Sequence, residues 1–462
     1  MTKYEEIVQN IKTQILNGTW KSGEKVPSLR QLTRKYKVSN NTILLALRLL
    51  KDEGYLFSVS AVGYFVSTKN LHQIDVPSKI ILKSYYDVEV KNLELVNFVN
   101  IELLDKFLTD SLITFLFNLY KTQQNYPQIS YLSGSPSLIS TLSDFFEEDN
   151  IFIQPENIII GSSFQLATEM IIRIFLEKKK LTTVALSNPS HYSVINIFEK
   201  WVNIKTINLL SDGWDLNEFE NLLSNEKIEL VYLTANFHDP TGICWSDEKK
   251  IHLLKLAEKY DFYIIEEDSY FPLYYKKSYS SLKSLERIGK ERIFYVRDFS
   301  MLFGSVVGIT CIVVPPKFRE KFLIEKAAFA VMPSKIQQKI LENIINTSYL
   351  KLFLKKFRKI LFYRAKYLTY LLKDIPELKI IYPLKGGCSI WIQLSKKIDE
   401  DKFYSLCKEN NLLILPGYIF YQDKKYNSKF RISFASTTLY EIKLGVMRIK
   451  NIISQVFHKM KN

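Results

Sequence analysis

The sequence predicts a multidomain protein, in which a small α+β domain is followed by a larger α/β domain that ends in a smaller α+β subdomain. Three observations support this prediction. A chain of 462 residues exceeds the ~250–300 residues at which single cores stop growing. Residues 1–67 carry three helical patterns followed by a hairpin pattern. From about Asn92 onward, short β-rich runs alternate with long helical stretches, as in sheets covered by helices.

The composition predicts a soluble, cytoplasmic protein with a polyanionic partner. A net charge of +15 favours nucleic acid as that partner. The longest apolar run, 306–316, is shorter than the ~20 residues of a membrane helix, and the first residues lack the apolar core of a signal peptide. We therefore expect no membrane segment. We also expect buried, reduced thiols and no metal site, because the cysteines lie far apart in sequence: Cys244, Cys311, Cys388 and Cys407.

Two helices are predicted at the N-terminus. The first covers Tyr4–Leu16, with apolar residues at helical spacing, and the glycine of Asn17-Gly18 can end it. The second begins after Pro27-Ser28, because Ser28 is placed to cap it and Leu29, Leu32 and Tyr36 then share one face.

A third helix and a hairpin complete the small domain. Ser39 is placed to cap a helix that runs to Lys51, with Gly54 as its stop. Its apolar residues Ile43, Leu47 and Leu50 face inward. The β-rich runs 55–59 and 64–67 then predict two strands of a hairpin, the wing.

Four short motifs in this domain resemble those of the GntR-type winged helix-turn-helix, over almost all of residues 2–67. They are Gly23-Glu-Lys-Val-Pro-Ser28-Leu-Arg30-Gln-Leu, Val38-Ser39, Asn41-Thr42 and Gly63-Tyr-Phe-Val66. The resemblance implies that the third helix enters the major groove of double-stranded operator DNA with its first turn. The DNA-binding residues it implies are Arg30, Lys35 and Lys37 at phosphates, Ser39, Asn40, Asn41 and Thr42 at base edges or phosphates, and Gly63 in the wing.

The charge of this domain agrees with DNA binding, because residues 1–69 carry eleven basic and five acidic side chains, a net +6. Two positions depart from the family. Asn40 stands where the family usually has arginine, and the wing offers Ser58, Ser60 and Ala61 in place of a basic residue. A scaffold that no longer binds DNA is therefore kept as an alternative.

Residues 68–91 are predicted to form a linker, and residues 92–462 the larger domain. Because strands separated by long helical stretches favour a mostly parallel sheet, ligands are expected at the carboxyl ends of its strands. Residues from about 345 to 462 are expected to form the smaller subdomain. The predicted strands cover 157–161, 183–186, 230–234, 262–266, 293–296 and 308–314.

Eight blocks of this domain occur in the order seen in fold-type I aminotransferases, so the whole chain resembles the MocR-type subfamily of GntR regulators. The resemblance implies a PLP-transferase-like fold, pyridoxal 5'-phosphate as the family cofactor, and a homodimer in which Tyr131 reaches across the subunit interface. The blocks contain Tyr131 to Leu138, Gly161-Ser162-Ser163, Asn188 to Tyr192 with His191, Asn236 to Gly242 with Asp239, Ile265 to Tyr270 with Glu267, Asp298-Phe-Ser-Met301, Leu415-Pro-Gly417 and Arg431.

The resemblance also implies a role for each pocket residue. Glu267 takes the place of the acid that pairs with the pyridine nitrogen. Asp239 replaces an asparagine that donates to the ring hydroxyl, and an ionised carboxylate can only accept. Asp298 replaces a serine at the cofactor phosphate, and Gly308 replaces an arginine there. Met301 stands at the lysine that forms the Schiff base, and a thioether cannot form an imine.

The remaining members of the predicted pocket retain family-like chemistry. Ser162 and Ser163 lie near a helix start and could contact phosphate, and His191 takes the place of a ring that stacks on the cofactor. Tyr270 lies in the same block as Glu267. Arg431 matches the arginine that binds a substrate carboxylate; the alternative for Arg431 is an ion pair with one of the new acids.

We therefore expect a dimeric DNA-binding transcriptional regulator that is not an enzyme. Its aminotransferase-like domain would sense a small-molecule effector, an amino acid or another amine, without a covalently bound cofactor. The alternative is a pyridoxal-phosphate-dependent enzyme or regulator that holds the cofactor non-covalently.

Overall fold

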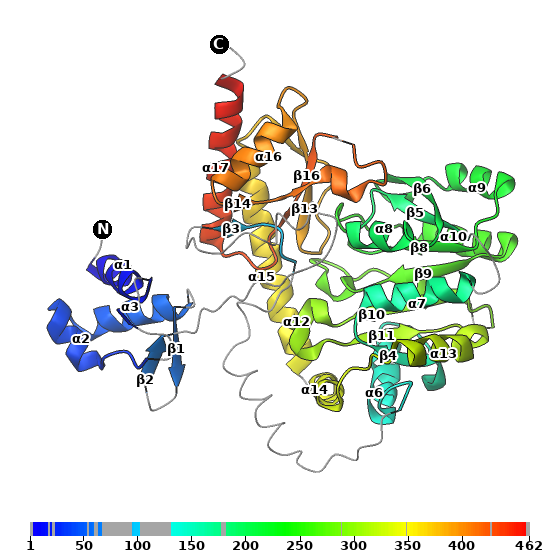
Figure 1. Cartoon of the computed structure of the whole chain (residues 1–462), viewed down its shortest axis with the longest axis horizontal. Coiled ribbons are helices and arrows are strands. Elements are labelled where there is room, and N and C mark those ends of the chain that lie inside the picture. The colour runs from blue at the N-terminus through cyan, green and yellow to red at the C-terminus, as the bar shows by residue number, and fades with distance from the viewer. Residues whose placement is uncertain are drawn as a thin grey trace. The chain divides into compact units, whose positions relative to one another are not determined.

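The computed structural model consists of two compact units, residues 1–93 and 94–462, which are described separately (Figure 1). The predicted linker, Gly54 and the tip of the wing lie outside the residues that the structure describes. The described residues are 3–16, 19–20, 24–52, 55–59, 63–66, 95–101, 131–176, 182–287, 289–347, 349–425 and 427–458.

The N-terminal unit contains the three predicted helices and the predicted hairpin. The helices are α1 (Lys3–Leu16), α2 (Leu29–Tyr36) and α3 (Asn40–Asp52), and the strands β1 (Leu56–Val59) and β2 (Gly63–Val66) pair antiparallel. Their core is formed by the apolar faces that the sequence predicts, because Ile11, Leu32, Ile43 and Leu50 are fully buried. The unit thus has the expected α+β architecture.

Both predicted helix caps are present. Ser28 and Gln31 form a capping box, in which each side chain bonds the backbone of the other residue. The Ser39 hydroxyl accepts the backbone N–H of Thr42 at 3.3 Å. One feature was not predicted: the segment before α2 adds to the wing, because Val26 N donates to Tyr64 O and Val66 N donates to Glu24 O, both at 2.9 Å.

The larger unit is built on an eight-stranded sheet of order β4-β11-β10-β9-β8-β5-β6-β7. All six predicted strands are present. Strands β10, β9, β8, β5 and β6 run parallel, whereas β11 and β7 run antiparallel to their neighbours. The bounds are β4 (Ile158–Gly161), β5 (Thr183–Asn188), β6 (Asn203–Leu210), β7 (Gly213–Trp214), β8 (Leu230–Leu233), β9 (Tyr263–Glu267), β10 (Ile293–Asp298) and β11 (Thr310–Val313).

Helices cover both faces of this sheet (Figure 1). Alternate strand residues enter two separate cores; Ile159 and Ile265, for example, pack with α7, whereas Ile158 and Ile264 join the core on the other face. The helices are α6 (Pro136–Glu147), α7 (Phe164–Leu176), α8 (Tyr192–Phe198), α9 (Leu216–Asn225), α10 (Asp247–Tyr260), α11 (Leu282–Leu285), α12 (Ser300–Val307), α13 (Arg319–Phe329) and α14 (Lys335–Asn346).

The C-terminal part forms a smaller α+β subdomain. Its four-stranded sheet has the order β12-β13-β16-β15. A short parallel pair joins β3 (Val96–Asn97) to β14 (Leu412–Leu413), so residues near the start of this unit pack against its end. The other elements are α15 (Tyr349–Leu372), β12 (Leu378–Ile380), β13 (Ser389–Leu394), α16 (Glu400–Glu409), β15 (Leu415–Pro416), β16 (Lys429–Ser433) and α17 (Leu439–His458).

Candidate functional site

Most of the predicted pocket residues lie at the carboxyl ends of strands, as expected for an α/β sheet. Glu267 ends β9 and Asp298 ends β10. Ser162 and Ser163 follow β4, and Asp239 lies in the loop after β8. Arg431 comes from β16 of the smaller subdomain.

Arg431 forms a buried ion pair with Asp239. Its Nη1 lies 2.7 Å from Asp239 Oδ2, and the two side chains are 2% and 5% exposed. The second Nη of Arg431 donates to the carbonyl oxygen of Val99. Of the alternatives for Arg431, the structure therefore contains the ion pair with a new acid.

Two further groups approach the same aspartate oxygen. The Tyr270 hydroxyl donates to Asp239 Oδ2 at 3.4 Å, and His191 Nε2 lies 3.6 Å from it. The other oxygen, Asp239 Oδ1, is buried without a hydrogen-bond partner among the described residues, and so is Arg431 Nε. Three groups thus surround Asp239 Oδ2, whereas Asp239 Oδ1 and Arg431 Nε could each form a further hydrogen bond.

His191 is held in a fixed position as the N-cap of α8. Its Nδ1 accepts the backbone N–H of Ser193 at 3.3 Å, which assigns the ring proton to Nε2, the atom facing Asp239. The ring stacks on Tyr192 with a centroid distance of 4.4 Å. Burial lowers the pKa of His191 to about 4, although the charge of Asp239 opposes this shift. The imidazole is therefore neutral near pH 7.

Glu267 is a buried carboxyl group bonded to hydroxyls. The Tyr232 hydroxyl donates to Oε2, and the Ser269 hydroxyl lies 3.3 Å from Oε1. Burial raises the pKa of Glu267 to about 7, and the charges of Asp298 and Asp239 add to this shift. Tyr232 was missed from the sequence; the one signal available was an isolated tyrosine in the otherwise aliphatic strand β8.

Asp298 lies at the amino end of α7. Its Oδ1 accepts the backbone N–H of Ser300 at 2.8 Å. The Ser300 hydroxyl and the backbone N–H of Phe164, the first residue of α7, also lie close to this carboxylate and favour its charged form. Burial raises the pKa of Asp298, and these hydrogen bonds oppose the shift. Ser163 caps the same helix, its hydroxyl accepting the N–H of Leu166 at 3.2 Å.

Met301 lies in the first turn of α12 and packs, half-buried, against the main core. Gly308 ends this helix in a left-handed conformation, with φ 52°. Tyr131 is 52% exposed, and in the described part of the chain it makes no polar contact with Asp239, Glu267 or Asp298. Its predicted reach across a subunit interface stays a prediction.

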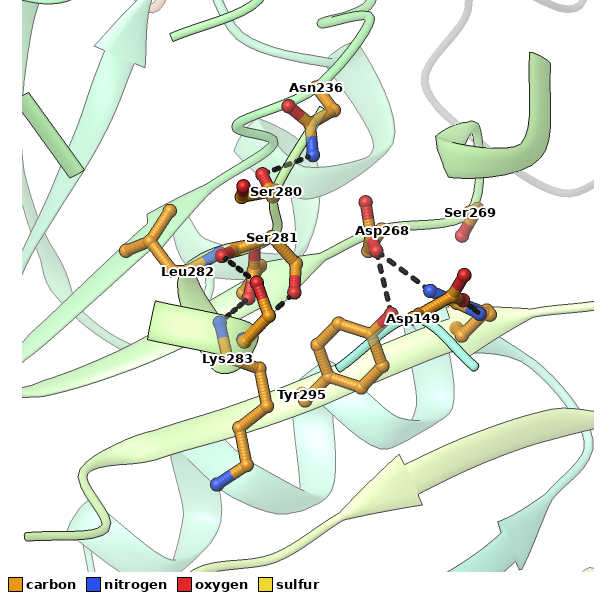
Figure 2. Close-up of polar contacts among 12 residues, drawn as sticks. Asp149, Asn236, Asp268, Ser269, Ser280, Ser281, Leu282, Lys283 and Tyr295 are labelled. Carbon is orange, nitrogen blue, oxygen red and sulfur yellow. Dashed lines mark hydrogen bonds and ion pairs between the residues drawn. The ribbon is translucent and has the colours of Figure 1, made fainter. Parts of the chain in front are cut away.

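The loop that carries Asp239 is held in place by a buried lysine, Lys250. Lys250 is completely buried, and its Nζ bonds Asn236 Oδ1 at 3.1 Å and Ser280 O at 2.6 Å. Asn236 in turn donates to Ser280 O at 3.0 Å (Figure 2). Since Asn236 begins the block that contains Asp239, these bonds fix the loop on the sheet.

The acids on either side of Glu267 stabilise β9 and its flanking loop. Glu266 accepts the backbone N–H of Leu282 and Lys283 at 2.6 and 2.8 Å. Asp268 accepts the Tyr295 hydroxyl at 2.6 Å (Figure 2), and Arg297 joins it to Asp149. Each of these side chains forms at least one internal hydrogen bond or ion pair, so they position Glu267, the member of the acidic run whose pKa responds to Asp239 and Asp298.

The residues of the N-terminal unit that are predicted to contact DNA lie mostly at its surface. Ser39, Asn41 and Arg30 are exposed, as is Lys37. Asn40 is exposed as well, but its carboxamide contacts the Thr33 hydroxyl at 2.8 Å.

Lys35 and Gly63 are two further residues that are predicted to contact DNA. Lys35 Nζ contacts Gln14 at 3.2 Å and lies over the rings of Trp20 and Tyr36. Gly63 begins β2 at φ 131°, a backbone conformation that favours glycine. The first turn of α3 thus presents polar groups to solvent.

Comparison with protein families identifies both units. Residues 3–66 match the bacterial regulatory proteins of the gntR family, and residues 117–449 match aminotransferase class I and II.

In the described residues, no group of His, Cys, Asp and Glu could hold a metal ion, and no helix is long and apolar enough to cross a membrane.

Two relatives align with nearly the whole of this chain. The HTH-type transcriptional regulator NorG of Staphylococcus aureus (strain USA300) is 26% identical and aligns with 94% of this chain and 100% of its own length. The HTH-type transcriptional regulator YdfD of Bacillus subtilis (strain 168) is 24% identical and aligns with 99% of this chain and 97% of its own.

Solved structures share the fold of the larger unit. The multiple substrate aminotransferase of Thermococcus profundus superposes with a TM-score of 0.74 at 18% identity, over 83% of this chain and 96% of its own. The α-aminoadipate aminotransferase LysN of Thermus thermophilus, complexed with a phosphopyridoxyl-leucine, superposes with a TM-score of 0.72 at 20% identity, over 79% of this chain and 93% of its own.

Proposed function

We propose that this chain, which belongs to the class I and II aminotransferase family and carries a GntR-family DNA-binding domain, is a MocR-type transcriptional regulator whose aminotransferase-like unit acts as a ligand sensor without catalysing transamination. It acts as a homodimer, in the cytoplasm, on double-stranded operator DNA. The family match of both units and the full-length relatives named as regulators support the DNA-binding part.

A single observation carries the non-catalytic part of the proposal. Met301 lies in the first turn of α12, and the resemblance in sequence aligns it with the Schiff-base lysine of aminotransferases. A thioether has no nitrogen from which an imine could form. The covalent attachment on which the family chemistry depends is therefore lacking at this position.

The surrounding residues also do not fit pyridoxal phosphate. The amides at the amino end of α7 and at Ser300 would suit a phosphate, but the carboxylate of Asp298 already accepts them. A dianion placed there would meet like charge, and Gly308 offers no side chain to neutralise it. Asp239, where the family uses an asparagine donor, is held by Arg431.

The charges of the same residues favour a cationic effector. Arg431 neutralises Asp239, and His191 is neutral, whereas Glu267 adds negative charge above pH 7 and Asp298 is a further acidic group near it. An ammonium group would offset that charge and could donate to Asp239 Oδ1, which lacks a partner among the described residues. We therefore propose an amino acid or another amine as the effector, and that its binding alters the spacing of the two DNA-binding domains in the dimer.

Calorimetric titration of the purified protein tests the sensor proposal. A panel of amino acids, monoamines and polyamines should contain at least one ligand that binds the wild type and binds Glu267→Gln more weakly. Mobility-shift assays with the neighbouring promoter region test the DNA-binding proposal independently. The absence of any binding amine contradicts the sensor function, and the absence of a shifted complex contradicts the regulator function.

A second candidate is a regulator that binds pyridoxal phosphate non-covalently. The capped amino end of α7, with Ser162 and Ser163, is the observation that favours it, because helix amino ends attract anions. Purification with added cofactor distinguishes the candidates. Cofactor that co-purifies but cannot be fixed by borohydride supports the second candidate, whereas our proposal predicts that none is retained.

A further inference from the structure

Helix α15 concentrates positive charge in the larger unit. Residues 1–69 account for +6 of the net +15, which leaves +9 for the rest of the chain. The 24 residues of α15 contain seven lysines and arginines and no acidic residue. One helix thus contributes most of the excess charge outside the DNA-binding unit.

The charges of α15 divide into a set that is buried or partnered and an external set that is exposed without an ion-pair partner among the described residues. Arg358 stacks on Tyr274, with its Cζ 3.9 Å from the ring centroid, and donates to Pro272 O at 2.7 Å. Arg364 is buried and donates to the carbonyl of Ala435. Lys351 pairs with Glu148 at 2.8 Å. Arg358 and Arg364 therefore stabilise the fold, and Lys351 has an ion-pair partner at the surface.

The external set forms one continuous face. The opposite face is buried at helical spacing, with Leu354, Phe357, Leu361, Ala365 and Leu368 in the core. We call the exposed side the lysine–tyrosine face. It consists of Leu352, Lys355, Lys356, Lys359, Tyr363, Lys366 and Tyr370.

The four lysines of this face have no ion-pair partner in the part of the chain that the structure describes. Lys355 and Lys359 stand four residues apart, a spacing at which like charges repel on a helix. The chain thus keeps an unfavourable arrangement of charge at its surface. A polyanionic partner would remove this repulsion.

The shape of the face fits a nucleic acid backbone. From Leu352 to Tyr370 it extends over ~27 Å at 1.5 Å per residue, a length along which duplex DNA presents many phosphates. Lysines neutralise phosphates, and tyrosine hydroxyls can bond them. A membrane surface fits poorly, because the apolar side of α15 is already buried in the core and cannot enter lipid.

We propose that the lysine–tyrosine face of α15 is a second DNA-contacting surface, which binds the phosphates of duplex DNA flanking the operator. This inference rests on the proposed function as a DNA-binding regulator. It adds a sequence-independent contact outside the winged helix-turn-helix domain. The larger unit then contributes directly to DNA affinity.

Binding of full-length protein to two duplexes tests this inference. A short duplex contains the footprinted operator alone, and a long duplex extends it on both sides. The test variant combines Lys355→Gln, Lys356→Gln, Lys359→Gln and Lys366→Gln. A matched control removes four exposed lysines of the same unit outside α15: Lys255→Gln, Lys396→Gln, Lys397→Gln and Lys408→Gln.

We expect the wild type and the control to bind the long duplex at least tenfold more tightly than the short one. The test variant should bind both duplexes alike. On the long duplex, the magnitude of its slope of log K against log salt should fall by about 3.6, because each of four phosphate contacts contributes about 0.9. Circular dichroism of both variants verifies that they fold.

Three results would overturn the inference. If the test variant keeps the length dependence, α15 does not contact DNA. If the test variant becomes monomeric in light scattering, the face is a subunit interface or binds another protein surface. If the wild type binds neither duplex, the proposed function fails as well, a result that is distinct from the first two.

Discussion

Helix α3 and the acid cluster of the larger unit (Asp239, Glu267 and Asp298) both lie where the resemblance to known families implies ligand-binding residues, but they leave different groups available. In α3, Ser39 and Asn41 are exposed, and the adjoining hydrogen bonds are local caps. In the larger unit, Arg431 and Asp298 are buried and bonded to the chain itself. The first surface is open to a ligand, whereas the second has its anion-binding groups satisfied by internal carboxylates.

If the proposed function holds, this difference explains how one chain can retain the function of one unit and change that of the other. Exposed side chains on a capped helix can be exchanged at little cost to folding. A buried cation needs a buried partner, and here Asp239 supplies it in place of a ligand. The larger unit thus keeps the aminotransferase fold, and the function that we propose moves its ligand preference from anions to cations.

Removal of Arg431 should have the largest effect on stability. Arg431→Ala leaves Asp239 buried without its partner and should lower the free energy of unfolding of the larger unit by ~3–5 kcal/mol. Urea unfolding followed by circular dichroism measures this. Lys259→Ala removes an exposed partner of Glu220 and should cost far less, because solvent screens exposed ion pairs. Equal losses of unfolding free energy in the two variants would show that the buried pair stabilises the fold no more than the exposed pair does.

Glu267 should make stability depend on pH. Its pKa rises from 4.5 in the unfolded chain to about 7 in the folded one, so the folded state holds the proton more tightly. The stabilisation from that proton is present below pH 4.5 and is lost as pH rises through 7. At ~1.4 kcal/mol per pKa unit, Glu267→Gln should gain on the order of 2–3 kcal/mol relative to wild type between pH 5 and 8. A pH-independent difference would contradict this account.

The exposed recognition helix should show the opposite pattern, a loss of binding without a loss of stability. Asn41→Ala should weaken operator binding by ~1–3 kcal/mol and leave non-specific binding almost unchanged. Arg30→Ala should weaken both kinds of binding and reduce the salt slope by about 1. Fluorescence anisotropy with operator and scrambled duplexes measures these changes. A similar loss on both duplexes for Asn41→Ala would place this residue at a phosphate.

The smallest effect is expected from restoring the missing amine. Met301→Lys alone should not give a coloured, borohydride-reducible adduct with pyridoxal phosphate, because Asp298 still occupies the amides of a phosphate site. The measurement is absorbance after incubation with cofactor, with mass spectrometry after reduction. A stable adduct in the single variant would show that the cofactor site is intact apart from the lysine.

Local signals made much of the fold predictable. The helices of the N-terminal unit have apolar spacing and caps such as Ser28 and Ser39 within a few residues of sequence. The buried strands of the larger sheet are short apolar runs, whereas the missed strand β6 mixes polar and apolar residues because it lies near the edge of the sheet. Strands at an edge bury less and carry a weaker pattern.

Pairing between distant residues limited the prediction of the site. The motifs located Asp239, Glu267, Asp298 and Arg431 in sequence, but which acid would pair with Arg431 depends on a contact across 192 positions. The roles of the Val99 carbonyl and the Phe164 amide were also missed, because backbone groups leave no mark on side-chain identity. Their positions follow only from the tertiary fold.

The affinity of the full-length protein for its operator, with and without a small amine or pyridoxal phosphate, tests the central claim most directly. We predict that one amine of the panel changes operator affinity at least fivefold, that Glu267→Gln reduces this response, and that pyridoxal phosphate has no effect. A response to pyridoxal phosphate together with no response to any amine would contradict the account.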